Sequence, residues 1–405
     1  QESFIKRFYI VRNLIKGVSG KLFIINSLTA TAYAFILPIM SIYLIDGIGA
    51  SPSFIAYYSV SFALSGMFFS QLFGSLADKG VNDRWLFLIS IICIVISAAS
   101  FIFVTEPWQA LAVGTILMGP GNACIPLILS MIKRFADQSG QNITSLNTQM
   151  RSGVSVVWIA GPALAFIVAD SWGYIANFYI AFTLAIFVII LTTKYLPTFN
   201  KAVETPSPLK SQPSTIPTIA LILGLVILLG NLANHVYITA MPLYLTQELS
   251  IPMYFPGLLL GVTAMFEIPV MLYAAKFSEK FGKSQLMVFG FICAVIYYLL
   301  IQYVTTIPLL ILSQAFNGLF YGVFVGLGIT LIQDAFPNKG GMASAYYTNM
   351  MRVGMMLGTS VAGFIAQYFD FKTALYASLA SASLSLILIV YMSKIPALKS
   401  IKATI

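Results

Sequence analysis

Charged residues are scarce in this sequence. Asp, Glu, Lys and Arg make up 9% of its 405 residues, whereas a soluble domain carries about 25%. With 59% hydrophobic residues, the chain could not cover a water-facing surface. Its three cysteines, Cys93, Cys124 and Cys293, lie within apolar runs, and their spacing fits neither a metal site nor a disulfide framework. These scarcities exclude a soluble enzyme and favour a protein that lies mostly in lipid, with no metal and no cofactor.

Sequence motifs of several other function classes are also missing. No Gly-x-x-x-x-Gly-Lys-Ser/Thr run occurs, which argues against a nucleotide-driven pump. No His-Glu-x-x-His run, nucleophile–histidine arrangement or pair of acids at membrane depth is found either. A membrane-embedded enzyme or a receptor is the alternative of another class, and a receptor would not explain the duplication described below.

Twelve apolar runs are long enough to cross a bilayer core of about 30 Å, which takes about 20 helical residues. They predict spans at 20–45, 53–77, 85–104, 108–134, 142–169, 171–193, 216–247, 253–277, 285–305, 307–333, 340–368 and 371–393. Residues 194–215 hold four prolines and three lysines and are typical of a linker. We expect an all-α polytopic membrane protein with six-helix bundles at 20–193 and 216–393.

Lysine and arginine are distributed very unevenly between the two predicted sides of the membrane. With a cytoplasmic N-terminus at 1–19 and a cytoplasmic tail at 394–405, 19 of the 22 lie inside and one, Lys372, lies outside. The positive-inside rule therefore predicts that both termini face the cytoplasm of a bacterial inner membrane. This explains the net charge of +9 without a nucleic-acid partner. The basic stretch 1–16 is either an amphipathic segment at the membrane surface or a flexible tail.

The two halves repeat each other at a shift of 201 residues. Asp78-Lys79, after the second span, matches Glu279-Lys280, after the eighth. Arg151-Ser152-Gly153 in the fifth span matches Arg352-Val353-Gly354 in the eleventh. Internal repeats are common in transporters, so the repeat favours a duplicated six-helix unit.

The loop after the second span resembles the signature loop of the major facilitator superfamily, roughly Gly-x-Leu-Ala-Asp-Arg-x-Gly-Arg-Arg. Gly74, Leu76, Ala77, Asp78 and Lys79 match its beginning, and the second copy, with Gly282 and Lys283, matches its end. The resemblance implies two bundles related by a pseudo-two-fold axis, with gating loops between helices. The candidate gating residues are Asp78, Lys79, Arg84, Glu279, Lys280 and Lys283. Ordinary charged turns are the alternative.

A narrower resemblance covers spans five to eleven. The stretch from Met150-Arg151 to Pro162 resembles bacterial sugar efflux transporters, as do Glu267-Ile268-Pro269, Phe316-Asn317 and Thr348-Asn349. It implies export of sugars or glycosides by proton antiport. Arg352 departs from that family's pattern. A multidrug or metallophore (siderophore-type) exporter is the alternative, because 31 Phe and 16 Met would suit an apolar cavity.

Three charges, Arg151, Glu267 and Arg352, lie deep in predicted spans, where charge is a functional signal. In the superfamily's architecture the fifth span lies against the eighth, so we expect Arg151 to approach Glu267. Burial favours a neutral carboxyl group, and a nearby guanidinium favours the carboxylate. Movement of Arg151 would thus let Glu267 take up and release a proton. A static ion pair and a contact with substrate are the alternatives.

Neutral polar residues of the expected cavity suit an uncharged polar ligand, since Asn and Gln both donate and accept hydrogen bonds and aromatic rings can stack on a sugar. The candidate substrate-binding residues are Asn26, Asn122, Arg151, Trp158, Asn231, Asn234, His235, Tyr237, Gln314, Asn317, Asn349 and Arg352. For the amides and for His235 the alternative is helix packing, worth about 0.6 kcal/mol for each hydrogen bond. Gly119-Pro120-Gly121, Gly161-Pro162 and the glycines at 318, 322, 326 and 328 predict bends or close packing. We expect a monomer whose partners are substrate, protons and lipid.

Overall fold

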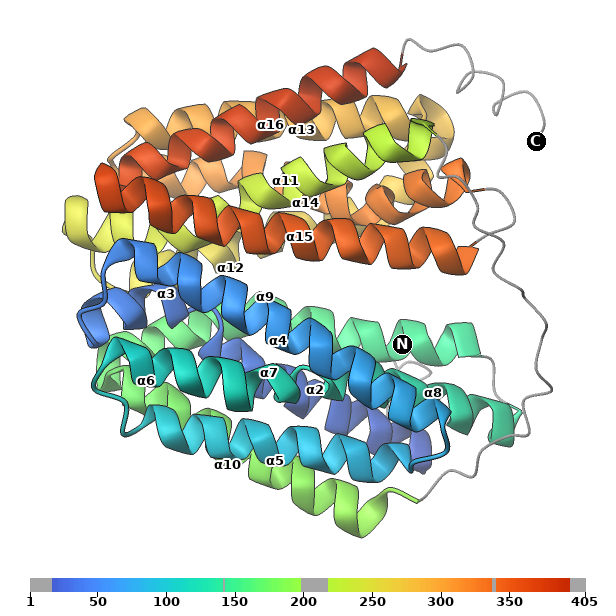
Figure 1. The fold of residues 1–405 in the computed structure, drawn as a ribbon. Helices are drawn as coiled ribbons and strands as arrows, with labels where there is room; N and C mark the ends of the chain where they lie inside the picture. The colour runs from blue at the N-terminus through green and yellow to red at the C-terminus, as the bar shows by residue number, and fades with distance from the viewer. Residues whose placement is uncertain (1–16, 141–142, 198–217, 337–339, 394–405) are drawn as a thin grey trace, which may run out of the picture. The chain divides into compact units, whose positions relative to one another are not determined.

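The structure is a computed structural model that describes residues 17–140, 143–197, 218–336 and 340–393. All regular secondary structure within these ranges is helical (Figure 1). This confirms the predicted all-α fold.

The helices of the first half follow the predicted spans closely. They are α2 (Val18–Ile36), α3 (Met40–Ile42), the π-helical turn η1 (Tyr43–Gly47), α4 (Pro52–Asp78), α5 (Asp83–Phe101), α6 (Pro107–Ala112), the π-helical turn η2 (Val113–Met118), α7 (Gly119–Gly121), α8 (Cys124–Ser139), α9 (Ile143–Trp172) and α10 (Tyr174–Tyr195). The Gly119-Pro120-Gly121 run marks a real interruption, because α7 ends there and α8 begins at Cys124.

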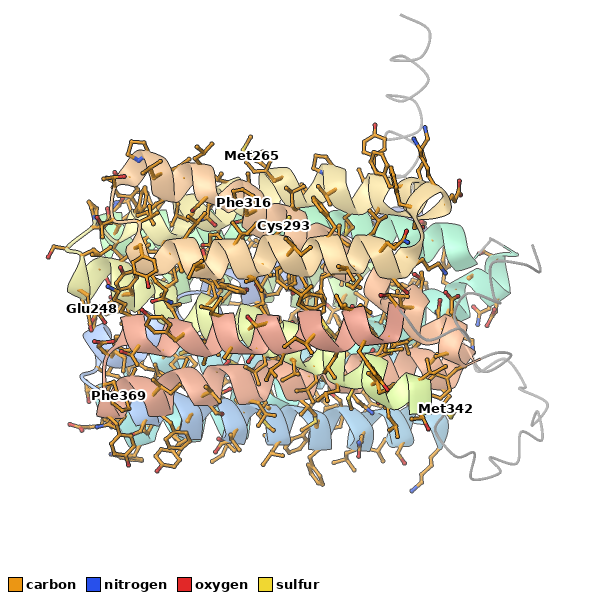
Figure 2. All side chains as sticks on the ribbon, turned by 90° about the horizontal axis from the view of Figure 1, so that it is seen from above. Glu248, Met265, Cys293, Phe316, Met342 and Phe369 are labelled. Atoms are coloured by element: carbon orange, nitrogen blue, oxygen red, sulfur yellow. The ribbon has the colours of Figure 1, made fainter. Side chains whose placement is uncertain are left out.

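The second half has the same order of long helices. They are α11 (Thr218–Leu243), the π-helical turn η3 (Tyr244–Glu248), α12 (Tyr254–Phe281), α13 (Lys283–Tyr303), α14 (Ile307–Ala335), α15 (Gly340–Tyr368) and α16 (Phe371–Ser393). In Figure 2, Glu248 and Met342 lie at opposite ends of this half. Gly282 lies between α12 and α13 and has a φ of 87°, a backbone conformation that favours glycine and ends the helix.

Ten helical segments of the described chain are long and apolar enough to cross a membrane. The two further predicted spans correspond to α9 and α15, each about 30 residues long. Residues Val156–Trp172 of α9 form a shorter apolar helix, and both α9 and α15 hold an Arg-x-Gly motif with Ser, Thr and Asn around it. These two helices are therefore the ones with least reason to face lipid all round.

The chain divides into two compact units, 1–50 with 61–210 and 51–60 with 211–405. The large buried side chains of the first unit include Phe87, Phe101 and Phe178, and Phe101 stacks on Phe178 with ring centroids 5.1 Å apart. The second unit has a larger aromatic core, in which Phe291, Phe320 and Phe324 pack together with Tyr237, Tyr297 and Tyr298.

The repeat extends to the end of the first long helix of each half. The π-helical turns Tyr43–Gly47 and Tyr244–Glu248 are separated by the same shift of 201 residues. Each turn begins with a Tyr-Leu pair, and a Met lies three residues before that pair, Met40 in the first half and Met241 in the second. The repeated Met-x-x-Tyr-Leu spacing is the sequence signal of this further part of the repeat.

Helix α16 begins at two carboxylate caps. Glu248 Oε1 accepts the backbone N–H groups of Phe371 at 2.8 Å and Lys372 at 3.3 Å, and Asp370 Oδ1 accepts that of Thr373 at 2.5 Å. The hydrogen bonds from Thr373 hold the pKa of Asp370 below its ordinary value. A carboxylate at a helix N-terminus satisfies free N–H groups and complements the helix dipole.

Glycines at every fourth position bring α14 directly against α12. A Cβ at Gly318 would lie 2.7 Å from the carbonyl oxygen of Thr263, and one at Gly322 would lie 2.7 Å from that of Glu267. Gly326 continues the row against Met271. Small residues at this spacing let membrane helices approach closely. The predicted close packing is confirmed for these glycines, and it places Glu267 in the α12–α14 seam.

Candidate functional site

One face of α15 carries polar side chains that remain partly or fully exposed in the middle of the helix. Thr348 and Asn349 are exposed, and Arg352 and Thr359 are partly exposed. Positions three, four and seven apart share one face of a helix, so these residues form a stripe, here called the α15 polar stripe. The two threonine hydroxyls donate to carbonyls of their own helix. The N–H donors of the Asn349 amide and the Arg352 guanidinium are therefore the groups of this stripe that could bind a ligand.

Arg352 lies near the midpoint of α15. At 1.5 Å per residue it is about 18 Å from the first residue of the helix and about 24 Å from the last. Asp83 forms an ion pair with Arg134, and Asp334 forms one with Lys283. Within the described residues, Arg352 therefore has no carboxylate partner.

The backbone beside each deep arginine is held by an asparagine. Asn231 Nδ2 on α11 donates to the carbonyl oxygen of Met351, at 2.6 Å, and Asn26 Nδ2 on α2 donates to that of Met150, at 3.2 Å. Each accepting residue directly precedes the arginine of its half. The predicted asparagines thus fix the register between the first and fifth long helices of each unit.

The glycine of each Arg-x-Gly motif permits this close approach. A Cβ at Gly354 would lie 2.5 Å from the carbonyl oxygen of Leu228, and a Cβ at Gly153 would lie 2.7 Å from the hydroxyl of Ser27. The motif therefore has a packing role in both units. The side chain of Arg151 lies outside the described part of the structure, so its expected approach to Glu267 stays a prediction.

Glu267 occupies the centre of α12, about 20 Å from either end. Its backbone packs against Gly318 and Gly322, the residue is partly exposed, and Tyr321 of α14 is close enough to interact with its charge. Within the described residues, no hydrogen bond or ion pair reaches the carboxylate. The structure thus puts an acid without a described cationic partner in a tight helix seam.

Three predicted substrate-binding residues instead belong to one buried network. Gln314 Oε1 accepts from Thr263 Oγ1 at 2.7 Å and from Tyr237 OH at 3.3 Å, while its Nε2 donates to Tyr297 OH at 3.0 Å. Asn317 Nδ2 reaches Thr263 Oγ1 at 3.5 Å. Gln314 and Tyr237 are fully buried, so the network ties α11, α12, α13 and α14 together. Thr263 and Tyr297 were not predicted, since only the tertiary structure brings them here.

The other predicted substrate-binding residues lie apart from this network. His235 packs against α15, because a Cβ added at Gly358 of α15 would lie 3.0 Å from the Cβ of His235. Asn234 is buried in α11. In the first unit, Asn122 lies against Gly66 of α4, and Trp158 of α9 is 43% exposed. Only Trp158 among these four presents a large exposed surface.

Each unit carries an ion pair between its third and fourth long helices. Arg134 Nε lies 3.0 Å from Asp83 Oδ2, which also accepts from Ser130 Oγ at 2.7 Å. In the second unit Lys283 Nζ lies 2.7 Å from Asp334 Oδ2. The first residue of the third long helix is thus an acid in one unit and a base in the other. The pair at Asp83 is nearly buried and the pair at Lys283 is about one-third exposed.

The remaining predicted gating residues are mostly exposed. Arg84 Nη2 donates to the carbonyl oxygen of Thr193 at 2.6 Å, which joins α5 to α10. Lys79 and Glu279 are exposed, and the ammonium of Lys280 lies 5.2 Å from the ring centroid of Phe281. The side chain of Asp78 is outside the described residues, so its gating role stays a prediction.

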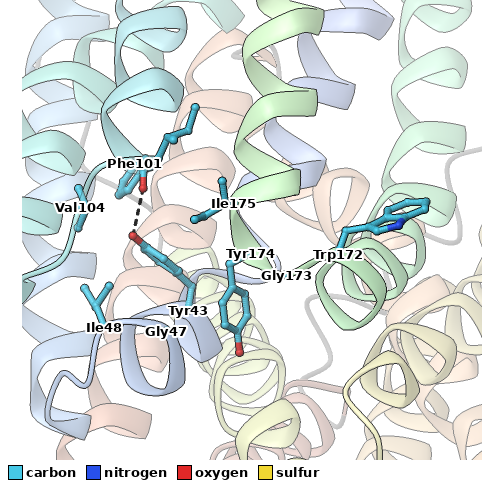
Figure 3. Close-up of a pocket in the computed structure, with 10 residues that line it drawn as sticks. Tyr43, Gly47, Ile48, Phe101, Val104, Trp172, Gly173, Tyr174 and Ile175 are labelled. Carbon is cyan, nitrogen blue, oxygen red and sulfur yellow. Dashed lines mark hydrogen bonds between the residues drawn. The ribbon is translucent and has the colours of Figure 1, made fainter.

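A cavity of about 310 Å³ lies beside η1 in the first unit (Figure 3). Tyr43, Phe101, Trp172 and Tyr174 contribute its aromatic walls, and Tyr43 OH donates to the carbonyl oxygen of Phe101 at 3.4 Å. None of the predicted site residues lines it. Tyrosine and tryptophan at the ends of membrane helices are typical of the lipid–water interface, which accounts for this composition.

Comparison with known proteins gives consistent results. The sequence model of the Major Facilitator Superfamily matches residues 22–232 and again 223–404. Sugar efflux transporter A of Escherichia coli is 27% identical over 87% of this chain and 90% of its own length. A multi-drug resistance efflux pump PmrA homolog of Lactococcus lactis is 22% identical over 85% and 87%. A mutant of the nucleoside transporter NupG superposes with a TM-score of 0.78 at 17% identity, over 93% of this chain and all of that one.

Proposed function

Because this chain belongs to the major facilitator superfamily of membrane transporters, we propose that it exports sugars, glycosides or similar small polar molecules by alternating access with proton antiport. The observation that carries this proposal is the α15 polar stripe. A helix at membrane depth that exposes Asn349 and Arg352 needs a water-filled cavity beside it, since lipid cannot satisfy their donors. Amide and guanidinium donors suit ligands rich in hydroxyl oxygens.

The relatives support the same substrate class. Proteins named sugar efflux transporters A and C of Escherichia coli match about nine-tenths of this chain at 27% and 25% identity. The drug-pump relative is less similar, at 22%. A multidrug exporter is the second candidate, and the aromatic residues of the first unit, including the exposed Trp158, are what favour it.

Glu267 is the proposed proton carrier. It is the acid at membrane depth, in the middle of α12. In the proposed cycle, Arg151 approaches Glu267 in one access state and favours its ionised form, and withdraws in the other so that the neutral form binds a proton. Both termini face the cytoplasm in this proposal, and the chain acts as a monomer in a bacterial inner membrane.

The test uses the full chain purified and reconstituted in liposomes with an imposed pH gradient. We expect uphill movement of a transported sugar that Glu267→Gln abolishes, while counterflow without a gradient survives, since exchange needs no net proton movement. Asp170→Asn removes an exposed carboxylate at a helix end and serves as the matched control. Uphill transport retained by Glu267→Gln would remove its coupling role. Transport of drugs in the absence of any sugar transport would favour the second candidate.

A further inference from the structure

Membrane-depth charges in this chain do not balance. The sequence contains 13 acidic residues, and of these only Glu267 falls in the middle of a long helix. Two arginines lie well inside long helices, Arg151 as the ninth residue of α9 and Arg352 as the thirteenth residue of α15. If Glu267 forms an ion pair with one of these arginines, no second carboxylate lies in the middle of a long helix to pair with the other. Charges within a membrane protein are normally paired, because an isolated one is costly.

Within its own unit, Arg352 is separated from Glu267 by the packing of the helices. The backbone of Glu267 lies against Gly318 and Gly322 in the α12–α14 seam, whereas Arg352 lies on α15, which packs against α11, α14 and α16. No ion pair joins the two in the described structure, and protonation of Glu267 would leave even less negative charge to share. The unbalanced charge is thus best assigned to Arg352.

The structure holds this arginine in place at its backbone, while its side chain stays partly exposed. Asn231 fixes the carbonyl of Met351, the residue before it, and Gly354, two residues after it, lets α11 approach within contact distance. A guanidinium offers five N–H donors in a planar fork that a carboxylate or phosphate can accept in pairs. The guanidinium of Arg352, which has a fixed backbone and no carboxylate partner within the described residues, is therefore suited to bind an anion beside the amide of Asn349.

We infer that the transported molecule carries an anionic group, a carboxylate or phosphate on a polar body, and that Arg352 binds that group. This inference rests on the proposed function and narrows its substrate class from neutral sugars to acidic ones. Asn349, one turn before Arg352 on the stripe, is the neighbouring donor for hydroxyl oxygens of the same molecule.

The experiment compares three molecules with one ring skeleton, namely glucose, glucuronate and glucose 6-phosphate. Their counterflow is measured in liposomes containing the full chain, with the membrane potential clamped so that substrate charge does not bias the flux. We expect at least about tenfold preference for glucuronate or glucose 6-phosphate over glucose, which corresponds to about 1.4 kcal/mol. The two acidic arms tell a carboxylate-binding site from a phosphate-binding one.

Variants assign the preference to the arginine. Arg352→Gln should reduce the ratio of acidic to neutral counterflow to about one, and Arg352→Lys, which keeps the charge but loses the fork, should retain part of it. Lys194→Gln removes an exposed cation at the end of α10 and should leave the ratio unchanged. Thermal unfolding of each variant shows whether the fold is intact.

The outcomes separate this inference from the proposed function. Counterflow of glucose at the same rate as the acids, or an acid preference that survives Arg352→Gln, overturns the inference and leaves sugar export standing. Failure to exchange any of the three, beside clear exchange of a cationic drug, overturns both.

Discussion

Two fully buried glutamines of the second unit should respond in opposite ways to the same substitution. Gln314 has partners for both side-chain atoms, whereas neither side-chain atom of Gln302 has a partner in the described structure. Leucine removes three interhelical hydrogen bonds at the first site, those with Thr263, Tyr237 and Tyr297. At about 0.6 kcal/mol each in a membrane, Gln314→Leu should cost about 2 kcal/mol. Gln302→Leu should be neutral or stabilising, since it removes two unsatisfied groups.

The chain supplies its own reporter for this measurement. Cys124 and Cys293 are buried free thiols, one in each unit, so a thiol-reactive dye added to detergent-purified protein becomes fluorescent as either unit unfolds. Only Gln314→Leu should lower the midpoint of the thermal transition. Equal destabilisation by both substitutions, or none by Gln314→Leu, would refute the reasoning that satisfied polar groups stabilise this core and unsatisfied ones do not.

Three further expectations concern other parts of the fold. Arg134→Leu leaves the nearly buried carboxylate of Asp83 without its cation and should cost about 3–5 kcal/mol of stability in the same unfolding assay. A double variant that also replaces Asp83 by Asn should recover stability if the unpaired carboxylate is the cause. Gly322→Ala should cost about 1–3 kcal/mol, because the added Cβ meets backbone of α12, while Gly74→Ala meets nothing within 4 Å and should be tolerated. Since the pKa of Asp370 is lowered in the folded chain, its cap on the Thr373 amide stabilises α16 above the ordinary aspartate pKa of about 3.9 and is lost as pH falls through the lowered value. The hydrogen-exchange protection factor of that amide should therefore fall in acid, and this fall should be absent in Asp370→Asn, in which Glu248 still caps Phe371 and Lys372.

The extent of the long helices could be predicted because the bilayer imposes one length on them. The span predicted at 340–368 coincides with α15, and the depth of Arg352 follows from counting residues along that helix. Such counts need no knowledge of neighbouring helices. They gave the positions of Glu267 and of the two Arg-x-Gly motifs along their helices for the same reason.

What a residue contacts could not be predicted in the same way. Gln314 and Tyr237 were expected in a cavity, and the structure pairs them with each other and with Tyr297. Nearly every face of these helices is apolar, so the sequence pattern does not show which face meets which neighbour. The exception is α14, where glycines at every fourth position mark the face that meets α12. The charge of the Arg-x-Gly motif indicates a functional residue, whereas only the tertiary structure shows that its glycine is needed for helix packing.

The reversed ion pairs bear on how a duplicated chain assembles correctly. Two halves of similar helices could in principle exchange partners while they insert into the membrane. If the third long helix of one half packed on the fourth of the other, Asp83 would face Asp334 and Lys283 would face Arg134. Each exchanged pairing would set like charges together, whereas each correct pairing joins opposite ones. Because the acid lies on the third long helix in one half and on the fourth in the other, the ion pairs favour packing within each half and disfavour exchange between the halves.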